Sequence, residues 1–363
     1  MDTPLGKPLS SGNPRLLVAA SGTGGHLFPA IAVADALAQQ QVQIEWLGVP
    51  DRLETQLVPQ QYRLHTIAVE GFQGRPSLGT LRTLIRFGVA IWQTRKLLKT
   101  GKFQGVLTTG GYIAAPAILA AKSLGLPSVL HDSNALPGKV TRFLSAYCSV
   151  VALGFAAAVP YLPKAKTTVV GTPVRDAFQQ SNPCDLPIPD GALLIVVTGG
   201  SQGAVALNKL VRECAPAWLE AGTWIVHLTG DRDPDLYGFE HPHYLARPFY
   251  DQMAGLLQRA DLAISRAGAG TLTELAITGT PSILVPYPYA AEDHQAYNAA
   301  VFTHAGAALS FRQQELTAGR LEEVVLELLK NPKRRQAMAA DAQSLAVQDS
   351  TAQFAAVAQQ VLL

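Results

Sequence analysis

Residues 16–26 read LLVAASGTGGH, and residues 193–204 read LLIVVTGGSQGA. Each stretch is a short apolar run that ends in a glycine-rich turn. A helix-like stretch follows each turn, FPAIAVADALAQQ from Phe28 and VALNKLVRECAPAWLE from Val205. A strand, a glycine turn and a helix in this order open a doubly wound α/β domain. Because the unit occurs twice, the sequence predicts an α/β protein with two Rossmann-like domains that face a central cleft.

The rest of the chain supports a division into two domains. From Arg15, apolar strand candidates alternate with amphipathic helices, which predicts a parallel sheet covered on both faces. The proline-rich stretch GTPVRDAFQQSNPCDLPIPDG then marks a boundary, and the alternation restarts after it. We expect four segments: a flexible tail (1–13), an N-terminal domain (14–174), a C-terminal domain (175–344) and a final helix (345–363) that can cross back to the N-terminal domain.

Composition excludes several classes of protein. The 363 residues are 48% hydrophobic and 15% charged, with a net charge of +2, so charge does not point to a nucleic-acid partner. The three cysteines are far apart, which suits a reducing compartment and forms no disulfide framework. We see no secretory signal and no apolar run of about 18 residues, so we expect a protein that is soluble or touches a membrane from one side.

The first glycine turn, Ser21–His26, suits an anion. Glycines let backbone N–H groups approach a ligand, and the following helix N-terminus favours negative charge. Pro29 suits the first turn of that helix. A dinucleotide site is the rival interpretation, because Gly22 and Gly24 fit half of that fingerprint and Glu45 stands where a ribose-binding acid would be. Leu27 occupies the third glycine position of the fingerprint and argues against it.

A third glycine cluster follows the strand candidate that ends at Ser265. Ala267–Gly270 predicts a tight loop, and Thr271 and Glu274 fall where a helix begins. One interpretation is a capping box made by these two residues. The other is a carboxylate that accepts hydrogen bonds from a ribose diol while the loop holds a phosphate. The two interpretations are compatible.

Seven motifs in one order make the pattern specific: SGTGGHLFPA, TTGGY, HDSNALPGK, GTPVR, GGSQGA, SRAGAGTLTE and DHQAYNA. Over roughly residues 14–363 they closely resemble the MurG family, the peptidoglycan N-acetylglucosaminyltransferases of the GT-B glycosyltransferase superfamily. The resemblance implies transfer of GlcNAc from UDP-GlcNAc to the 4-hydroxyl of undecaprenyl-diphosphate-linked MurNAc-pentapeptide (lipid I). The anomeric centre inverts, and lipid II and UDP are the products.

The resemblance implies that the C-terminal domain holds the donor. Ser201 and Arg175 would bind the diphosphate, since a guanidinium fork suits phosphate oxygens. Glu274 would bind the ribose diol. Phe249 would contact the uracil ring, and backbone groups of Tyr250 would read its edge. The expected donor site is completed by the phosphate loop and by residues that read the sugar hydroxyls: Ala269, Gly270, Thr271, Leu272, Thr273, Gln295 and Asn298.

The N-terminal domain would hold the acceptor and the catalytic base. Thr23, Gly24 and Gly25 offer backbone donors to the lipid diphosphate or the incoming sugar, and the same cleft is lined by Tyr112 and Asn134. An inverting transfer needs a base for the proton of the acceptor hydroxyl. His26 is the first candidate because imidazole titrates near neutral pH. Asp132 is the alternative.

No metal and no cofactor are expected. Asp231 and Asp233 form a D-x-D, which holds a divalent ion in other glycosyltransferases, but they lie in the polar turn sequence GDRDPDLYG. Arg175 and helix N-termini can neutralise the leaving UDP instead. His241 and His243 lack companion ligands and are expected in a surface loop.

Two other functional classes stay open on the residues alone. UDP-GlcNAc 2-epimerases share the two-domain architecture and need no lipid acceptor. A dinucleotide-binding regulatory protein would bind NADH and no UDP. Label from GlcNAc in an organic-extractable product would indicate the transferase.

A basic, apolar stretch suggests a membrane surface. Residues 71–131 contain no Asp or Glu but eight Lys and Arg residues. Packing of the apolar face on the N-terminal sheet is one explanation. The other is peripheral attachment to the anionic, cytoplasmic face of the inner membrane, where basic residues contribute about 1 kcal/mol each. The residues expected to contact the membrane are Arg82, Ile85, Arg86, Trp92 and Arg95.

Overall fold

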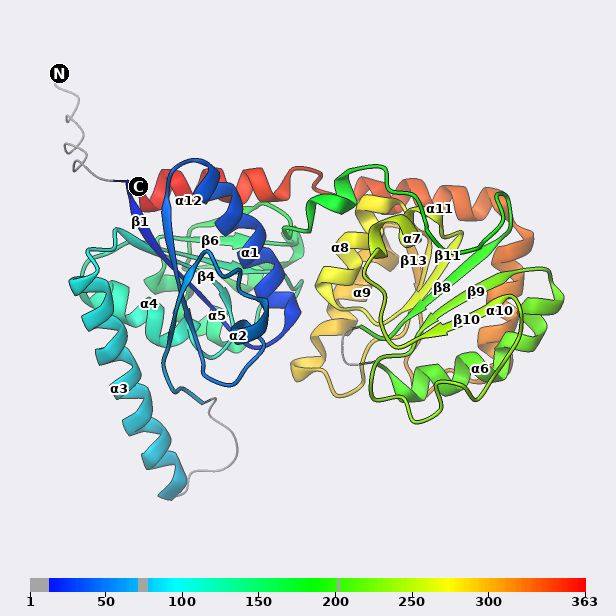
Figure 1. Ribbon diagram of the computed structural model, residues 1–363, viewed down its shortest axis with the longest axis horizontal. Coiled ribbons are helices and arrows are strands. Elements are labelled where there is room, and N and C mark those ends of the chain that lie inside the picture. Colours follow the sequence, from blue (N-terminus) through cyan, green and yellow to red (C-terminus); the bar gives the residue numbers. More distant parts are fainter. Residues whose placement is uncertain (1–12, 71–77, 201–202) are drawn as a thin grey trace.

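The chain forms two α/β lobes joined by a short linker (Figure 1). The computed structural model describes residues 13–70, 78–200 and 203–363. Nearly all of the predicted tail therefore lies outside the described residues, as does Ser201. Each lobe is built on one parallel sheet with helices on both faces, so the prediction of two Rossmann-like domains is confirmed.

The N-terminal lobe is a seven-stranded parallel sheet with the order β3-β2-β1-β4-β5-β6-β7. Side chains of the central strand β1 alternate between the two faces: Leu16 and Val18 join one buried cluster, and Leu17 and Ala19 join the other. The strands are β1 (Arg15–Ala20), β2 (Gln43–Gly48), β3 (Arg63–Thr66), β4 (Gly105–Gly110), β5 (Ser128–Asp132), β6 (Val150–Leu153) and β7 (Thr167–Val169).

Helices cover both faces of this sheet. Helix α1 packs on one face, and α3 and α4 pack on the other. The described helices of the lobe are α1 (Gly24–Gln39), α2 (Glu54–Leu57), α3 (Leu78–Thr100), α4 (Ala114–Ser123), α5 (Lys139–Leu144), η1 (Ser145–Tyr147) and η2 (Ala156–Tyr161).

The last helix of the chain, α12 (Ser350–Leu362), lies against α1 in the N-terminal lobe (Figure 1). Its Phe354 and Leu362 are buried in the same cluster as Leu27 of α1. The Ser350 hydroxyl donates to the Thr172 carbonyl at 3.0 Å. The chain therefore crosses between the lobes twice, once in the linker after β7 and once before α12.

The C-terminal lobe is a six-stranded parallel sheet with the order β10-β9-β8-β11-β12-β13. Sequence analysis misses both edge strands, because each is only three or four residues long and lacks an extended apolar run. The strands are β8 (Leu194–Thr198), β9 (Trp224–Leu228), β10 (Tyr244–Arg247), β11 (Leu262–Ser265), β12 (Ser282–Leu284) and β13 (Ala308–Ser310).

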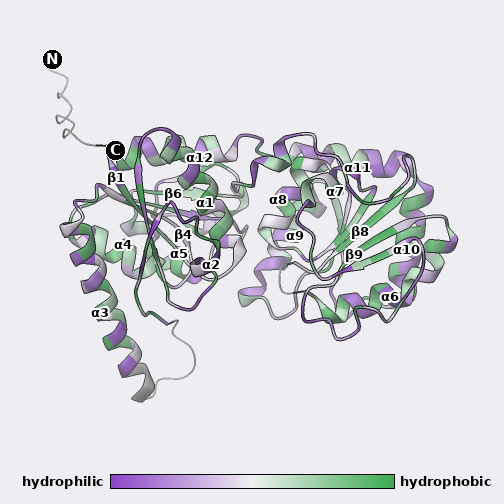
Figure 2. Ribbon diagram, viewed as in Figure 1, coloured by the Kyte–Doolittle hydropathy of each residue, from purple (hydrophilic) through white to green (hydrophobic). Residues whose placement is uncertain are grey.

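The sheet of this lobe separates two buried clusters, one on each face, and helices cover both faces. Strands β8 and β9 are coloured as hydrophobic in Figure 2, and their apolar residues belong to these clusters. The described helices are η3 (Asp176–Gln179), α6 (Val205–Glu220), α7 (Met253–Arg259), α8 (Ala269–Thr278), η4 (Ala291–Asp293), α9 (His294–His304), α10 (Ala318–Lys330) and α11 (Pro332–Ser344).

Two helices begin earlier than the sequence indicates. Helix α1 starts at Gly24, so Pro29 lies inside it and not in its first turn. Helix α8 starts at Ala269 after Gly268, whose φ is −69° and ψ is 135°. The capping-box interpretation of Thr271 and Glu274 is therefore wrong, because both residues lie within the helix.

Within residues 13–70, 78–200 and 203–363, no helix has both the length and the apolar character that crossing a bilayer requires.

Candidate active site

The glycine turns lie at the topological switch point of each sheet. In the N-terminal lobe the switch lies between β1 and β4, and in the C-terminal lobe it lies between β8 and β11. Open α/β sheets bind ligands at the carboxyl ends of the strands at this point. The turns after β1 and β8, and the loop after β11, are therefore at the positions where a doubly wound lobe binds its ligand.

The turn after β1 exposes backbone donors at the start of α1. Thr23 precedes the helix with extended backbone, and Gly25 is exposed in the first turn. Gly22 has a φ of 105°, a left-handed conformation that glycine adopts without strain. Its N–H donates to the buried Glu54 carboxylate at 3.2 Å, and the other Glu54 oxygen accepts from Val49 N–H at 2.8 Å. Glu54, which sequence analysis did not single out, thus fixes the position of this turn by joining it to the end of β2.

His26 lies in the first turn of α1 against the turn after β4. A Cβ on Gly110 would lie 3.0 Å from His26 Nε2, so only glycine leaves room for this ring. Gly111 is more restricted still, because its Cβ would lie 2.2 Å from the Ser21 carbonyl oxygen. The two glycines of the motif TTGGY therefore allow the turn after β4 to pack closely against the first glycine turn. The motif alone does not reveal this role.

The imidazole of His26 is held neutral. Burial lowers the pKa of His26 below its ordinary value, and the nearby Asp132 charge and Ser21 carbonyl oppose this shift only in part. Its Nδ1 atom is buried and has no hydrogen-bond partner among the described residues. A neutral imidazole near neutral pH can accept a proton.

The other candidate base, Asp132, accepts hydrogen bonds from its own loop and from α5. One carboxylate oxygen accepts from the backbone and side-chain nitrogens of Asn134 at 3.0 and 3.3 Å. The other accepts from Gly138 N–H at 2.9 Å and the Thr141 hydroxyl at 2.6 Å. Four donors leave little capacity for a substrate proton, and they fix the shape of the loop 132–138.

Tyr112 stands at the rim of the N-terminal site. It is 37% exposed, and the Arg52 guanidinium lies over its ring at 5.6 Å from the centroid. Arg52 follows β2 and Tyr112 follows β4, and these strands flank β1 on opposite sides. The pair therefore brings together the loops on the two sides of the first glycine turn.

In the C-terminal lobe, the start of α8 supplies backbone N–H groups. Gly268 and Gly270 have open space at the Cβ position. Leu272 is fully buried in the core, and the Thr273 hydroxyl donates to the Ala269 carbonyl at 2.9 Å. Among the predicted phosphate residues, 269–273, the side chain of Leu272 therefore packs the helix, and only backbone groups and Thr271 remain for a ligand.

Glu274 and Arg175 meet between the lobes. Arg175 Nη2 lies 3.9 Å from Glu274 Oε1, and its guanidinium lies over the rings of Phe28 and Phe178 at 5.8 and 5.3 Å. Burial raises the pKa of Glu274 to about 7, with Arg175 opposing the shift. Because Phe28 belongs to α1, this cluster places the predicted ribose-binding carboxylate opposite the first glycine turn.

Gln295 and Asn298 both bind the loop before α8. Gln295 Oε1 accepts from the N–H groups of Ala267 and Tyr287 at 3.2 and 2.9 Å. Asn298 is fully buried, and its Nδ2 donates to the Ala267 carbonyl and to Asn134 Oδ1, both at 3.1 Å. The polar atoms of Asn298 are thus taken by protein groups, whereas the Gln295 amide nitrogen is still available to a sugar hydroxyl.

Phe249 and Tyr250 have opposite environments. Phe249 is 61% exposed and can contact a base. Tyr250 is buried, and its hydroxyl donates to Asp185, so only its backbone is available to a ligand.

The residues on which the dinucleotide and metal interpretations depend bind other protein groups. Glu45 is in the middle of β2, and its carboxylate binds Arg15 and His65 instead of facing the glycine turn. Asp233 of the D-x-D accepts from Asn208 and Arg212 at 2.6 and 2.5 Å and from Asp235 N–H at 3.0 Å.

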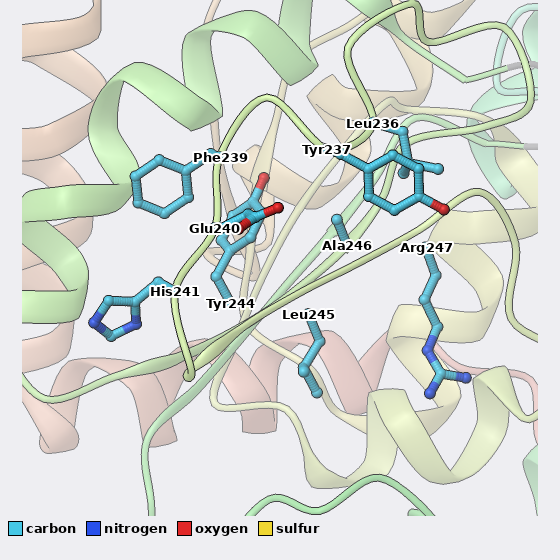
Figure 3. A pocket seen from close by; sticks show the side chains of 9 residues that line it. All are labelled: Leu236, Tyr237, Phe239, Glu240, His241, Tyr244, Leu245, Ala246 and Arg247. Atoms are coloured by element: carbon cyan, nitrogen blue, oxygen red, sulfur yellow. The ribbon is translucent and has the colours of Figure 1, made fainter.

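A shallow hollow of about 260 Å³ lies elsewhere, along the edge strand β10 (Figure 3). Its lining includes Tyr237, Phe239, His241 and Arg247, and none of the predicted site residues. It is separate from the two switch points.

Helix α3 projects away from the N-terminal sheet (Figure 1). Ala90, Thr94 and Leu98 are buried on its packed side. Ile85 and Trp92 are 60% and 61% exposed, and Leu84 and Val89 are also exposed. The basic groups are not equivalent: Arg82 is exposed, Arg86 pairs with Glu70 at 2.5 Å, and Arg95 donates to Ser123 at 2.6 Å.

Two Rossmann-like lobes, each with a glycine turn at the switch point of its parallel sheet, are the architecture of a GT-B glycosyltransferase. The chain matches the glycosyltransferase family 28 N-terminal domain over residues 16–153 and its C-terminal domain over residues 194–360. It belongs to the MurG family of glycosyltransferases within family 28.

Relatives that align over nearly their whole length support this membership. The chain is 61% identical over 351 residues to the UDP-N-acetylglucosamine–N-acetylmuramyl-(pentapeptide) pyrophosphoryl-undecaprenol N-acetylglucosamine transferase of Nostoc punctiforme, covering 96% of this chain and 98% of the relative. It is 63% identical over 341 residues to the transferase of the same name from Rippkaea orientalis, covering 94% and 97%. The crystal structure of MurG from Acinetobacter baumannii aligns with a TM-score of 0.79 and 32% identity, covering 96% of this chain and 100% of that one.

Proposed function

We propose that this enzyme transfers GlcNAc from UDP-GlcNAc to the 4-hydroxyl of undecaprenyl-diphosphate-MurNAc-pentapeptide, giving lipid II and UDP in peptidoglycan synthesis. The identity of 61–63% to transferases named for these substrates supports the assignment. The same identity argues against the epimerase alternative. The single structural observation that supports it most is the meeting of Arg175, Glu274 and the α1 residue Phe28 between the two lobes.

The donor side of the proposal follows from the C-terminal lobe. The Glu274 carboxylate accepts from both ribose hydroxyls, and the N–H groups at the start of α8 bind the phosphates. Ser201 and Arg175 also bind the diphosphate, and Phe249 contacts the uracil ring beside the Tyr250 backbone. Gln295 presents its free amide nitrogen to the sugar. Arg175 and the helix N-terminus neutralise the leaving UDP, and we expect no metal and no cofactor.

The acceptor side follows from the N-terminal lobe. Backbone N–H groups of Thr23, Gly24 and Gly25 bind the lipid diphosphate, with Tyr112 and Asn134 along the same cleft. His26 takes the proton of the 4-hydroxyl as that oxygen attacks the anomeric carbon from the face opposite UDP. The bond from the anomeric carbon to UDP breaks, so configuration inverts. His26 is preferred to Asp132 because the carboxylate of Asp132 already accepts four hydrogen bonds.

Attachment to the cytoplasmic face of the cell (inner) membrane completes the proposal. The exposed residues Ile85, Val89 and Trp92 follow helical spacing on α3, separate from its packed side. Arg82 and the exposed Lys96 and Lys99 flank this stripe. Apolar burial with basic flanks is the pattern of interfacial helices. An acceptor tethered to a polyprenyl chain makes docking of this lobe useful.

UDP release is the direct test of the proposed reaction. The purified chain is incubated with UDP-GlcNAc, with and without a lipid I analogue. We expect UDP release that depends on the acceptor. Release at the same rate without the acceptor would indicate hydrolysis and contradict the assignment.

A further inference from the structure

An ion pair joins the two lobes outside the residues assigned so far. Arg142 lies on α5, directly after the loop 132–138, and Glu292 lies in η4, directly before α9. Arg142 Nη2 donates to both Glu292 carboxylate oxygens, each at 2.6 Å. The two side chains are 29% and 32% exposed, so solvent screens the pair only partly.

The segment that carries Glu292 has an unusual backbone. Glu292 and the next residue, Asp293, have φ values of 52° and 56°. Residues with a Cβ seldom adopt this left-handed region, and side-chain contacts must compensate for the strain. Arg142 holds the first of these residues from the other lobe, and Arg312 holds the second at 2.7 Å.

A second link lies one turn further along α9. Asn298 Oδ1 accepts from Ala135 N–H at 2.8 Å, and its Nδ2 donates to Asn134 Oδ1 at 3.1 Å. The same Nδ2 donates to Ala267, just before α8. The two links together join the start of α9, which carries Gln295, to the loop 132–138 of the N-terminal lobe.

We propose that Arg142 and Glu292 are positioning residues for the transfer reaction, and that they hold the start of α9 at a fixed position relative to the loop 132–138 of the N-terminal lobe. The inference rests on the proposed function of the two lobes. UDP binds the C-terminal lobe and does not need the pair. Transfer needs the donor sugar beside Gln295 to face the acceptor hydroxyl, so the pair acts on turnover.

Charge reversal tests the proposal. Arg142→Glu and Glu292→Arg are each expected to lower kcat about fivefold, the upper range for a partly exposed pair, while the Kd of UDP stays within about twofold. The double reversal Arg142→Glu/Glu292→Arg is expected to restore kcat, because it re-forms the pair with opposite polarity. Arg320→Glu is the matched control, since it breaks the exposed pair with Glu323 on α10 and should leave kcat unchanged.

The possible results distinguish failure of the positioning role of Arg142 and Glu292 from failure of the proposed transfer activity. Unchanged kcat in both single reversals, or a double reversal no better than the singles, overturns the proposal. Where a reversal lowers the melting temperature, Arg142→Gln and Glu292→Gln serve instead, and equal kcat in these variants and the wild type also overturns it. A wild-type chain that transfers no GlcNAc contradicts the proposed function instead, and this inference falls with it.

Discussion

The proposed role of Glu274 in ribose binding, together with its elevated pKa, predicts that donor binding depends on pH. Burial raises this pKa from 4.5 to about 7 in the free protein. Each pH unit of such a shift corresponds to about 1.4 kcal/mol, so keeping the carboxylate ionised in the folded chain costs about 3 kcal/mol. Because the pKa is raised, the carboxyl contributes most to stability below pH 4.5, and that contribution is lost as the pH rises through about 7.

Glu274→Gln removes this ionisation. Relative to the wild type, the free energy of unfolding of the variant should increase by about 2 kcal/mol between pH 5 and pH 8. Urea denaturation at both pH values measures this difference.

The affinity for UDP-GlcNAc should change with pH in the opposite direction to the stability contribution of Glu274. In the proposed site only the ionised carboxylate accepts from both ribose hydroxyls, so the affinity of the wild type for UDP-GlcNAc should fall about tenfold from pH 8 to pH 6. UDP-GlcNAc is the suitable ligand because its diphosphate does not titrate in this range. Glu274→Ala should weaken binding at least tenfold at pH 8, since hydrogen bonds to a charged group contribute about 1.5–3 kcal/mol each. Calorimetry that finds equal affinity at pH 6 and pH 8, together with an unfolding difference that does not change with pH, would refute the reasoning.

Three further predictions concern the acceptor lobe and the membrane. His26→Ala should lower kcat by about 10²–10⁴ with UDP affinity intact, and steady-state kinetics showing only a few-fold drop would assign the base elsewhere. Gly110→Ala should lower kcat in a folded chain, because its φ is 113° and its Cβ would lie 3.0 Å from His26 Nε2, and circular dichroism with kinetics checks both parts. The double variant Ile85→Gln/Trp92→Gln should co-sediment less with anionic vesicles, while its kcat on a soluble acceptor is unchanged. Equal binding of the wild type to anionic and neutral vesicles would rule out a contribution from the basic residues.

Local patterns predicted the architecture because each lobe is built from strands followed by glycine turns. The turns after β1 and β8 have the expected strand-turn-helix form, and strand order then places them at the switch points. Helix starts were less predictable. Thr271 and Glu274 match a capping box, but the preceding Gly268 already has the extended backbone that begins α8.

Contacts between the lobes could not be predicted, because sequence periodicity does not specify how two domains face each other. Asn298 matches a motif whose resemblance implies sugar recognition, yet its side chain is taken by Asn134, Ala135 and Ala267. Arg142 and Glu292 lie 150 residues apart, and neither belongs to a distinctive pattern. For α3, the helical spacing indicated an apolar face, and only the structure separates its packed side from the exposed stripe at Ile85 and Trp92.

Transfer of the sugar is the central claim, and the fate of labelled GlcNAc tests it most directly. The purified chain is given UDP-GlcNAc labelled in the sugar and a lipid I analogue, and the products are partitioned between water and an organic solvent. We expect label in the organic phase in amounts equal to the UDP released. Label that stays attached to the nucleotide as an epimerised sugar, or that appears as free sugar in water, would contradict the assignment.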